Sequence, residues 1–127
     1  MDWYRANARD LPWRRTRSAY AIWISEIMLQ QTRVAAAIPY YERFLSELSD
    51  VSALANVDDD RLHKLWEGFG YYSRARNLKR AAVEIVARFG GELPNTYEAL
   101  LTLPGIGEYT AGAIASISFG EAVPAVD

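Results

Sequence analysis

Residues 103–115 read Leu103-Pro104-Gly105-Ile106-Gly107-Glu108-Tyr109-Thr110-Ala111-Gly112-Ala113-Ile114-Ala115. Both glycines can take a positive φ, which allows a foreign backbone to approach closely. The helix predicted after the second glycine begins with N–H groups that lack helical partners, at the positive end of its dipole. Such a helix start can hold a phosphate. The alternative is a tight corner between two helices, and the spacing alone favours it because short glycine motifs are weak signals.

Composition limits the classes of protein to consider. The chain has 127 residues, half of them hydrophobic, which suits one globular domain with its own core. It contains no cysteine, so disulfides and thiolate metal sites are excluded within these residues, and a cytoplasmic location of bacterial type is expected. Apolar runs are too short for a membrane span, and the first residues lack a signal-peptide pattern. The net charge of −2 does not by itself indicate nucleic-acid binding.

Apolar residues at helical spacing predict an all-α fold. The expected helices cover 3–9, 20–30, 34–48, 51–55, 59–67, 74–89, 96–102 and the segment from the glycine turn to residue 119. Pro39 predicts a kink or a fresh helix start. Asp58, Ser73 and Asn95 are the expected N-caps. No pair of strands is predicted, and the short connections indicate one domain.

Glu26 is the acidic residue whose position is most unusual. It lies at the edge of, or inside, the apolar stripe formed by Trp23 and Ile27, so it is either a site residue or a boundary glutamate that reaches solvent. The polar run Gln30-Gln31-Thr32 that follows suits contact with a molecule in a groove, and it also suits helix capping. The only histidine, His63, lies between charged residues and is expected at the surface.

Taken in order, several motifs resemble the helix-hairpin-helix base-excision glycosylases, and within them the adenine DNA glycosylases. The motifs are Leu11-Pro12-Trp13-Arg14, Ser25 to Thr32, Gly68 to Leu78, Leu103 to Gly107, Thr110-Ala111 and Pro124 to Asp127. The resemblance implies the helix-hairpin-helix DNA glycosylase fold with a six-helix barrel core. It places this barrel over 19–127, the hairpin at about 96–119, and an N-terminal arm over 1–18 that packs on a further domain.

The resemblance also implies a reaction, the hydrolysis of the bond between adenine and its sugar. Glu26 matches the general acid that protonates adenine, a role that requires a carboxyl group able to hold its proton. Asp127 matches a second carboxylate that stabilises the sugar cation, and Tyr109 a tyrosine that hydrogen-bonds within this group. Related lyases carry a nucleophilic lysine where this chain has Tyr109. A monofunctional glycosylase is therefore implied.

Further roles are implied at matching positions. Arg14 resembles an adenine-pocket residue, Gln31 with Leu29 a wedge in the base stack, and Tyr71 an aromatic that intercalates near 8-oxoguanine. The remaining expected DNA contacts are Gln30, Thr32, Gly105 and Gly107. The carbonyls of Leu101, Leu103 and Ile106 resemble a site for a monovalent cation that bridges to phosphate.

The expected partner is double-stranded DNA with adenine opposite 8-oxoguanine or guanine, bound by a monomer, with no membrane involved. The family usually continues past the aspartate with four cysteines that hold a [4Fe–4S] cluster and with a domain that recognises 8-oxoguanine. No cofactor is expected within these residues, and the chain is expected to be a fragment that stops before the cluster. Three alternatives stay open: a related glycosylase for another base, a helix-hairpin-helix module that binds DNA without chemistry, and a helical interaction domain.

Overall fold

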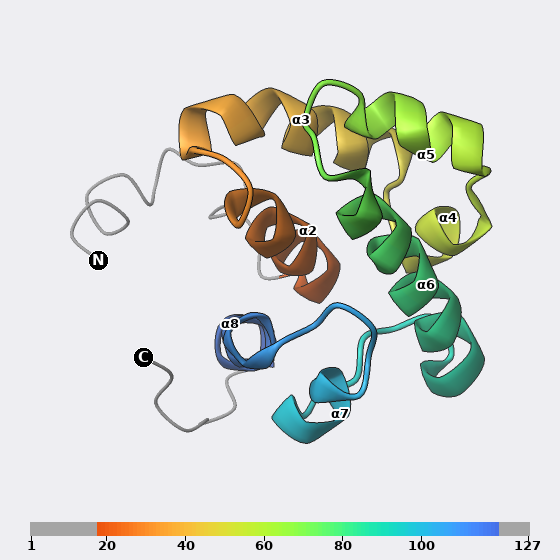
Figure 1. Ribbon diagram of the computed structural model, residues 1–127. Coiled ribbons are helices and arrows are strands. Elements are labelled where there is room, and N and C mark those ends of the chain that lie inside the picture. The colour runs from red at the N-terminus through yellow and green to blue at the C-terminus, as the bar shows by residue number, and fades with distance from the viewer. Residues whose placement is uncertain (1–17, 120–127) are drawn as a thin grey trace.

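The structure is a computed structural model that describes residues 18–119. This range contains seven helices and no strand, which confirms the predicted all-α class (Figure 1). The helices are α2 (Ala19–Leu29), α3 (Val34–Glu47), α4 (Val51–Asn56), α5 (Asp59–Trp66), α6 (Tyr72–Phe89), α7 (Tyr97–Leu101) and α8 (Glu108–Phe119). The predicted helix over 3–9 and most of the predicted arm over 1–18 lie outside the described residues.

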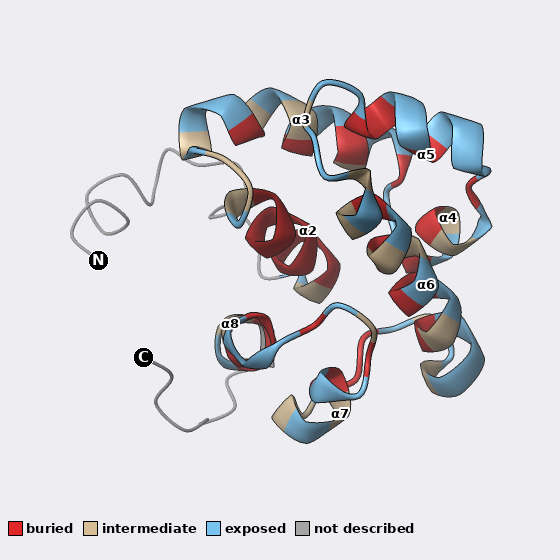
Figure 2. Ribbon diagram, in the orientation of Figure 1, coloured by how far each residue is buried: buried red, intermediate tan, exposed pale blue. Residues whose placement is uncertain are grey.

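Helix α2 lies at the centre of the fold. Every residue from Tyr20 to Met28 is buried, so this helix has no solvent-facing side over that span (Figure 2). A helix buried in this way is covered by neighbours on several sides, and most of its residues are apolar. It packs against α3 and α8, while α6 packs against α4 and α5.

The core holds several large side chains with almost no exposure. These include Trp23, Phe44, Leu54, Trp66, Ile85, Leu100 and Ile114. A buried polar contact joins two of the elements, because the Tyr20 hydroxyl donates to the Leu48 carbonyl at 2.7 Å. Burial raises the pKa of Tyr20, so its hydroxyl keeps its proton at neutral pH. None of the described helices combines the length and the apolar character needed to cross a membrane.

Pro39 does not start a fresh helix, which is one of the two outcomes that the sequence predicts. It lies inside α3, which is assigned as one helix from Val34 to Glu47. A proline in this position deprives the carbonyl of Ala35 of its helical donor. Both Ala35 and Pro39 are exposed, so water can satisfy that carbonyl without breaking the helix.

The helix starts follow the sequence prediction in part. Asp58 caps α5 as predicted, since its carboxylate accepts from the Arg61 amide at 2.7 Å. The predicted cap Asn95 is wrong by one residue: Thr96 caps α7 by accepting from the Ala99 amide at 3.2 Å. The predicted cap Ser73 is also wrong, because α6 begins one residue earlier, at Tyr72. Its N-cap position is a left-handed residue that contributes no side-chain hydrogen bond.

The Thr96 cap gives a direct test. We expect Thr96→Ala to lower the free energy of unfolding by about 1 kcal/mol, because the Ala99 amide loses its acceptor. The matched variant Asn95→Ala removes a polar side chain one residue earlier and should change stability by less than about 0.5 kcal/mol. Urea unfolding followed by circular dichroism measures both values. Equal losses in the two variants would contradict the assignment.

Candidate functional site

The turn between α7 and α8 is shaped by Gly105. Its φ of +74° lies in the left-handed region, and a Cβ there would lie 3.2 Å from the Asn77 Cβ on α6. The turn is closed by the Ile106 amide, which donates to the Leu103 carbonyl at 3.2 Å, and both of these side chains are buried. The glycine therefore allows the turn to pack closely on α6.

Gly107 differs from Gly105. Gly107 does not use the positive φ that a glycine allows, and a Cβ there would meet no protein atom within 4 Å. Its carbonyl accepts the Ala111 amide at 2.9 Å, which is the first helical bond of α8. The amides that precede Ala111 in this first turn have no helical acceptor. The turn thus presents open backbone at Gly107, while Gly105 is held against the protein.

The Gln30 side chain joins three parts of the fold. It lies at the C-cap of α2, and its Nε2 donates to Thr110 Oγ1 in α8 at 3.0 Å. The guanidinium of Arg74 in α6 donates to Gln30 Oε1 at 2.5 Å. Thr110 is buried and Arg74 is half-buried, so these contacts tie the hairpin to both α2 and α6.

Two cavities meet at Gln30 and Gly105. One of about 330 Å³ lies between α2, α6 and the hairpin turn, with Trp23 and Leu78 among its apolar residues. The second, of about 520 Å³, is a shallow surface pocket that follows the turn from Gly105 to Thr110. Gln30, predicted as a DNA contact, therefore lies on the wall of both cavities.

The loop between α5 and α6 carries an exposed aromatic side chain. Tyr71 has a φ of +48° and is 74% exposed. The amide of Gln31 donates to the carbonyls of Gly70 at 3.0 Å and Phe69 at 3.4 Å. The structure therefore brings Gln31 and the Tyr71 loop together, although forty residues separate them in the sequence (71 − 31).

Glu26 is buried in α2, with 5% of its surface exposed, so the boundary interpretation is wrong. It lies one helical turn before Gln30, and residues four apart occupy the same side of a helix.

The other predicted site residues lie in different places. Leu29 is the last residue of α2, and Thr32 lies half-buried in the turn that follows. Tyr109 lies in the first turn of α8 and is 53% exposed. Arg14 and Asp127 lie outside the described residues.

The three carbonyls predicted for a monovalent cation belong to the end of α7 and to the hairpin turn. The Leu103 carbonyl accepts the Ile106 amide with one of its two lone pairs. Ile106 itself is buried, whereas Leu101 is exposed at the end of α7. Between residues 18 and 119 no group of three acidic or histidine side chains is placed to hold a metal. The sequence also has no cysteine to bind an iron–sulfur cluster.

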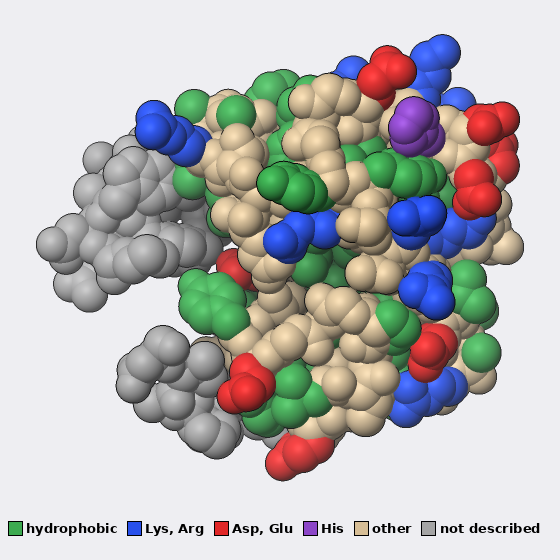
Figure 3. All heavy atoms as spheres, in the orientation of Figure 1, with side chains coloured by type: hydrophobic (Ala, Val, Ile, Leu, Met, Phe, Trp, Pro, Cys, Tyr) green, Lys and Arg blue, Asp and Glu red, His purple; other side chains and the backbone are tan. Residues whose placement is uncertain are grey.

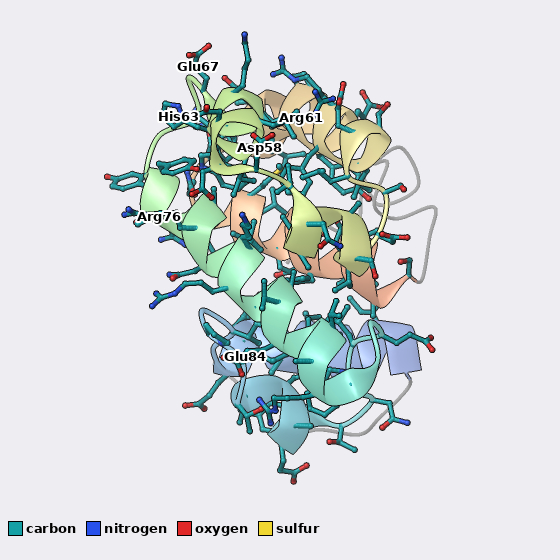
Figure 4. The ribbon with its side chains drawn as sticks, turned by 90° about the vertical axis from the view of Figure 1, so that its right-hand side faces the viewer. Asp58, Arg61, His63, Glu67, Arg76 and Glu84 are labelled. Atoms are coloured by element: carbon teal, nitrogen blue, oxygen red, sulfur yellow. The ribbon has the colours of Figure 1, made fainter. Side chains whose placement is uncertain are left out.

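The outer surface is mixed in charge. Figure 3 shows basic and acidic side chains interspersed on this face of the molecule, with the single histidine on the surface among them. Figure 4 shows His63 at the outer side of α5, and its ring contacts Tyr72 with the centroids 4.6 Å apart. His63 is therefore a surface residue, as predicted.

Sequence reasoning missed three contributors to the site. It named Arg74 and Thr110 only as parts of longer motifs, yet both contact Gln30. It gave Trp66 no role in the site, yet the Trp66 indole donates to the Gly70 carbonyl at 2.8 Å. These contacts join residues far apart in the sequence or depend on loop geometry, so spacing gives no sign of them.

The hairpin and the arrangement of helices agree with a known family. Residues 24–127 match the family described as the HhH-GPD superfamily of base excision DNA repair proteins. The chain belongs to the HhH-GPD superfamily. This superfamily assignment covers every helix from α3 to α8 and most of α2, including Glu26.

Similar proteins with known names are adenine DNA glycosylases. That of Homo sapiens is 47% identical over 136 residues, a region that covers all of this chain and 25% of the human protein. The Arabidopsis thaliana protein is 43% identical, and the match covers 24% of its length. The protein of Buchnera aphidicola from Acyrthosiphon pisum is 42% identical, and the match covers 37% of its length. The chain therefore spans from about a quarter to slightly more than a third of the length of these relatives.

Solved structures agree with the superfamily fold. A thermostable thymine-DNA glycosylase superposes with a TM-score of 0.85 at 30% identity, over 94% of this chain and 56% of that protein. A trapped endonuclease III–DNA covalent intermediate gives a TM-score of 0.76 over 83% of this chain and 50% of that protein. Its identity of 24% supports a common fold alone.

The two hairpin glycines predict opposite effects on stability. We expect Gly105→Ala to lower the free energy of unfolding by about 1–2 kcal/mol, because the residue has a positive φ and its Cβ would press on Asn77. At Gly107 φ is not positive and a Cβ has open space. The stability of Gly107→Ala should therefore equal or slightly exceed that of the unmodified protein. Thermal unfolding of the two variants checks this, and a loss at Gly107 as large as that at Gly105 would contradict it.

Proposed function

We propose that this chain is the catalytic helical region of a monofunctional DNA glycosylase that removes adenine mispaired with 8-oxoguanine or guanine. The reaction is the hydrolysis of the N-glycosidic bond in base excision repair. The similarity to adenine DNA glycosylases supports adenine as the base removed. Double-stranded DNA with such a mispair is the proposed partner, bound by a monomer.

The burial of Glu26 carries this proposal. Glu26 is a carboxyl group in a helix that is buried over most of its length, and buried ionisable groups of this kind are concentrated at functional sites. The same helix turn leads to Gln30, which contacts the hairpin. A nucleotide held by the hairpin would thus lie near the side of α2 from which Glu26 could protonate its base. Protonation of adenine makes it a better leaving group, and this is the general-acid step.

The hairpin is proposed to hold the DNA backbone. Its open amides around Gly107 suit a phosphate oxygen, and contacts of this kind position DNA without reading its sequence. The target nucleotide must leave the duplex before its glycosidic bond can be reached, at a cost of a few kcal/mol. Tyr71 and Gln31 are proposed to fill the stack beside the lesion, and Arg14 to contact the adenine.

Asp127 is proposed as the ionised carboxylate that stabilises the sugar cation, in the manner of paired carboxylates in glycosidases. Tyr109 is proposed to hydrogen-bond within this group. Since Tyr109 is not a lysine, this position offers no amine for a Schiff base, and cleavage of the DNA backbone is not part of the proposed activity. A [4Fe–4S] cluster, which would need ligands outside this chain, takes no part in these steps.

The acid is tested by Glu26→Gln in the protein isolated at its natural length. We expect adenine release from an A:8-oxoguanine duplex to fall by about 10²- to 10⁴-fold, because the amide cannot donate the acid proton. Duplex binding should change little, since the side chain keeps its size. Single-turnover assays measure the rate. The control Glu42→Gln alters an exposed glutamate on α3 and should leave the rate unchanged. A wild-type rate in Glu26→Gln would refute the assignment.

The DNA contact of the hairpin is tested by Gly107→Ala. A methyl group at Gly107 projects into open space where the phosphate is proposed to approach. We expect duplex affinity, measured by fluorescence anisotropy, to fall by about tenfold, or about 1.4 kcal/mol, while the melting temperature of the free protein is maintained. Unchanged affinity would place the DNA backbone elsewhere.

A second function is favoured by one observation. The superposition on a thymine-DNA glycosylase, at 30% identity, is compatible with a related glycosylase that acts on another mismatched base. A panel of duplexes with A:8-oxoguanine, A:G, T:G and U:G pairs separates the two proposals by the base released. Binding without release of any base would instead support a non-catalytic DNA-binding module.

A further inference from the structure

Two side chains from different parts of the fold converge on one carbonyl. The Gly70 carbonyl accepts from the Trp66 indole N–H at 2.8 Å and from the Gln31 amide at 3.0 Å. Trp66 is the last residue of α5, and Gln31 lies in the turn after α2. The loop that leads into α6 is thus tied to two elements at a single atom.

This carbonyl controls the backbone of Tyr71. It belongs to the peptide unit between Gly70 and Tyr71, so fixing its direction restricts the φ of Tyr71. That residue has φ +48° and ψ +58°, a left-handed conformation that is unfavourable for a residue with a Cβ. Because the side chain is 74% exposed, its own packing does little to offset the strain. A strained residue persists only where its surroundings hold it, and such residues concentrate at functional sites.

The two donors differ in how firmly they are held. The Trp66 ring is 2% exposed and packs edge-on against Phe44 and Phe69, with centroid distances of 6.0 and 5.1 Å. Its N–H therefore has a fixed direction. Gln31 is half-buried, and its buried Oε1 has no hydrogen-bond partner among the described residues. A buried polar atom without a partner costs free energy, so the present position of Gln31 is easier to leave.

We propose that Trp66 is a positioning residue that sets the backbone of Tyr71 for insertion beside the mispair, and that Gln31 is the exchangeable donor. When Gln31 moves into the base stack, the indole N–H keeps the Gly70 carbonyl in place. The loop thus retains the orientation of Tyr71 after the hydrogen bond from Gln31 is lost. This inference rests on the proposed function, because it assigns Tyr71 and Gln31 to the DNA.

The test is a double-mutant cycle between Trp66→Phe and Tyr71→Ala in the protein at its natural length. Trp66→Phe keeps an aromatic ring in the core and removes the N–H. The measured quantity is the ratio of affinities for two duplexes, one with a non-hydrolysable 2′-fluoro adenosine opposite 8-oxoguanine and one undamaged. We expect Trp66→Phe to lower this ratio about five- to tenfold, and to have almost no effect in the Tyr71→Ala background.

Two further variants separate positioning from stability. Phe44→Leu disturbs the packing beside the Trp66 ring but leaves the indole N–H in place, so it should lower the melting temperature without changing the affinity ratio. Gly70→Ala disfavours the loop conformation, because φ is +90° there, yet its Cβ meets no protein atom within 4 Å. Gly70→Ala should therefore lower the affinity ratio as Trp66→Phe does, while the packing of the core is unchanged.

A measurement without DNA keeps the inference distinct from the proposed function. Chymotrypsin cleavage at the Tyr71–Tyr72 bond should be faster in Trp66→Phe than in Phe44→Leu, because only the first variant frees the Gly70 carbonyl. Equal cleavage rates, or a Trp66→Phe effect that persists in full in the Tyr71→Ala background, would overturn the inference. If the unmodified protein binds both duplexes equally, the proposed function fails, and the cleavage rates then decide whether Trp66 holds the loop.

Discussion

The hydrogen bonds of Gln30 are the interaction on which the arrangement of the site depends. The fold has a centre, α2, that is buried on all sides, and the site begins where this helix reaches the surface. At that point one amide group accepts from Arg74 on α6 and donates to Thr110 on α8. The hairpin, α6 and the helix with the buried carboxyl are therefore held together by a single side chain.

The choice of an amide for this position has a physical reason. An amide has a donor and an acceptor at the end of one planar group, so it can serve a guanidinium and a hydroxyl at once. A carboxylate could accept from both partners, but it would carry a charge beside the proposed phosphate site. The neutral side chain links the elements without adding a second negative charge to that of Glu108, which lies in the first turn of α8.

The sequence predicted the elements well and the contacts between them poorly. The periodicity of apolar residues located all seven described helices, because that pattern reflects the face that each helix buries. Burial of Glu26 could not be decided, since α2 is covered all round and its stripe has no edge. The N-cap error at Asn95 arose because the neighbouring Thr96 offers similar capping chemistry. The error at Ser73 arose because α6 begins from a left-handed residue without any side-chain cap. The resemblance to glycosylases named the residues of the site, but the tie from Gln31 to the Gly70 carbonyl depends on how two loops meet in space.

The contact between Gly105 and Asn77 sets the distance between the hairpin turn and Tyr71. Tyr71 occupies the N-cap position of α6, and Asn77, six residues later, lies against the hairpin turn. Six residues of α-helix extend over about 9 Å, which corresponds to between two and three base steps along one DNA strand. On the proposed function, the same rigid helix thus separates the residue that probes the base stack from the turn that holds the backbone. Helix α6 would then fix the distance between the bound phosphate and the base pair that the protein examines.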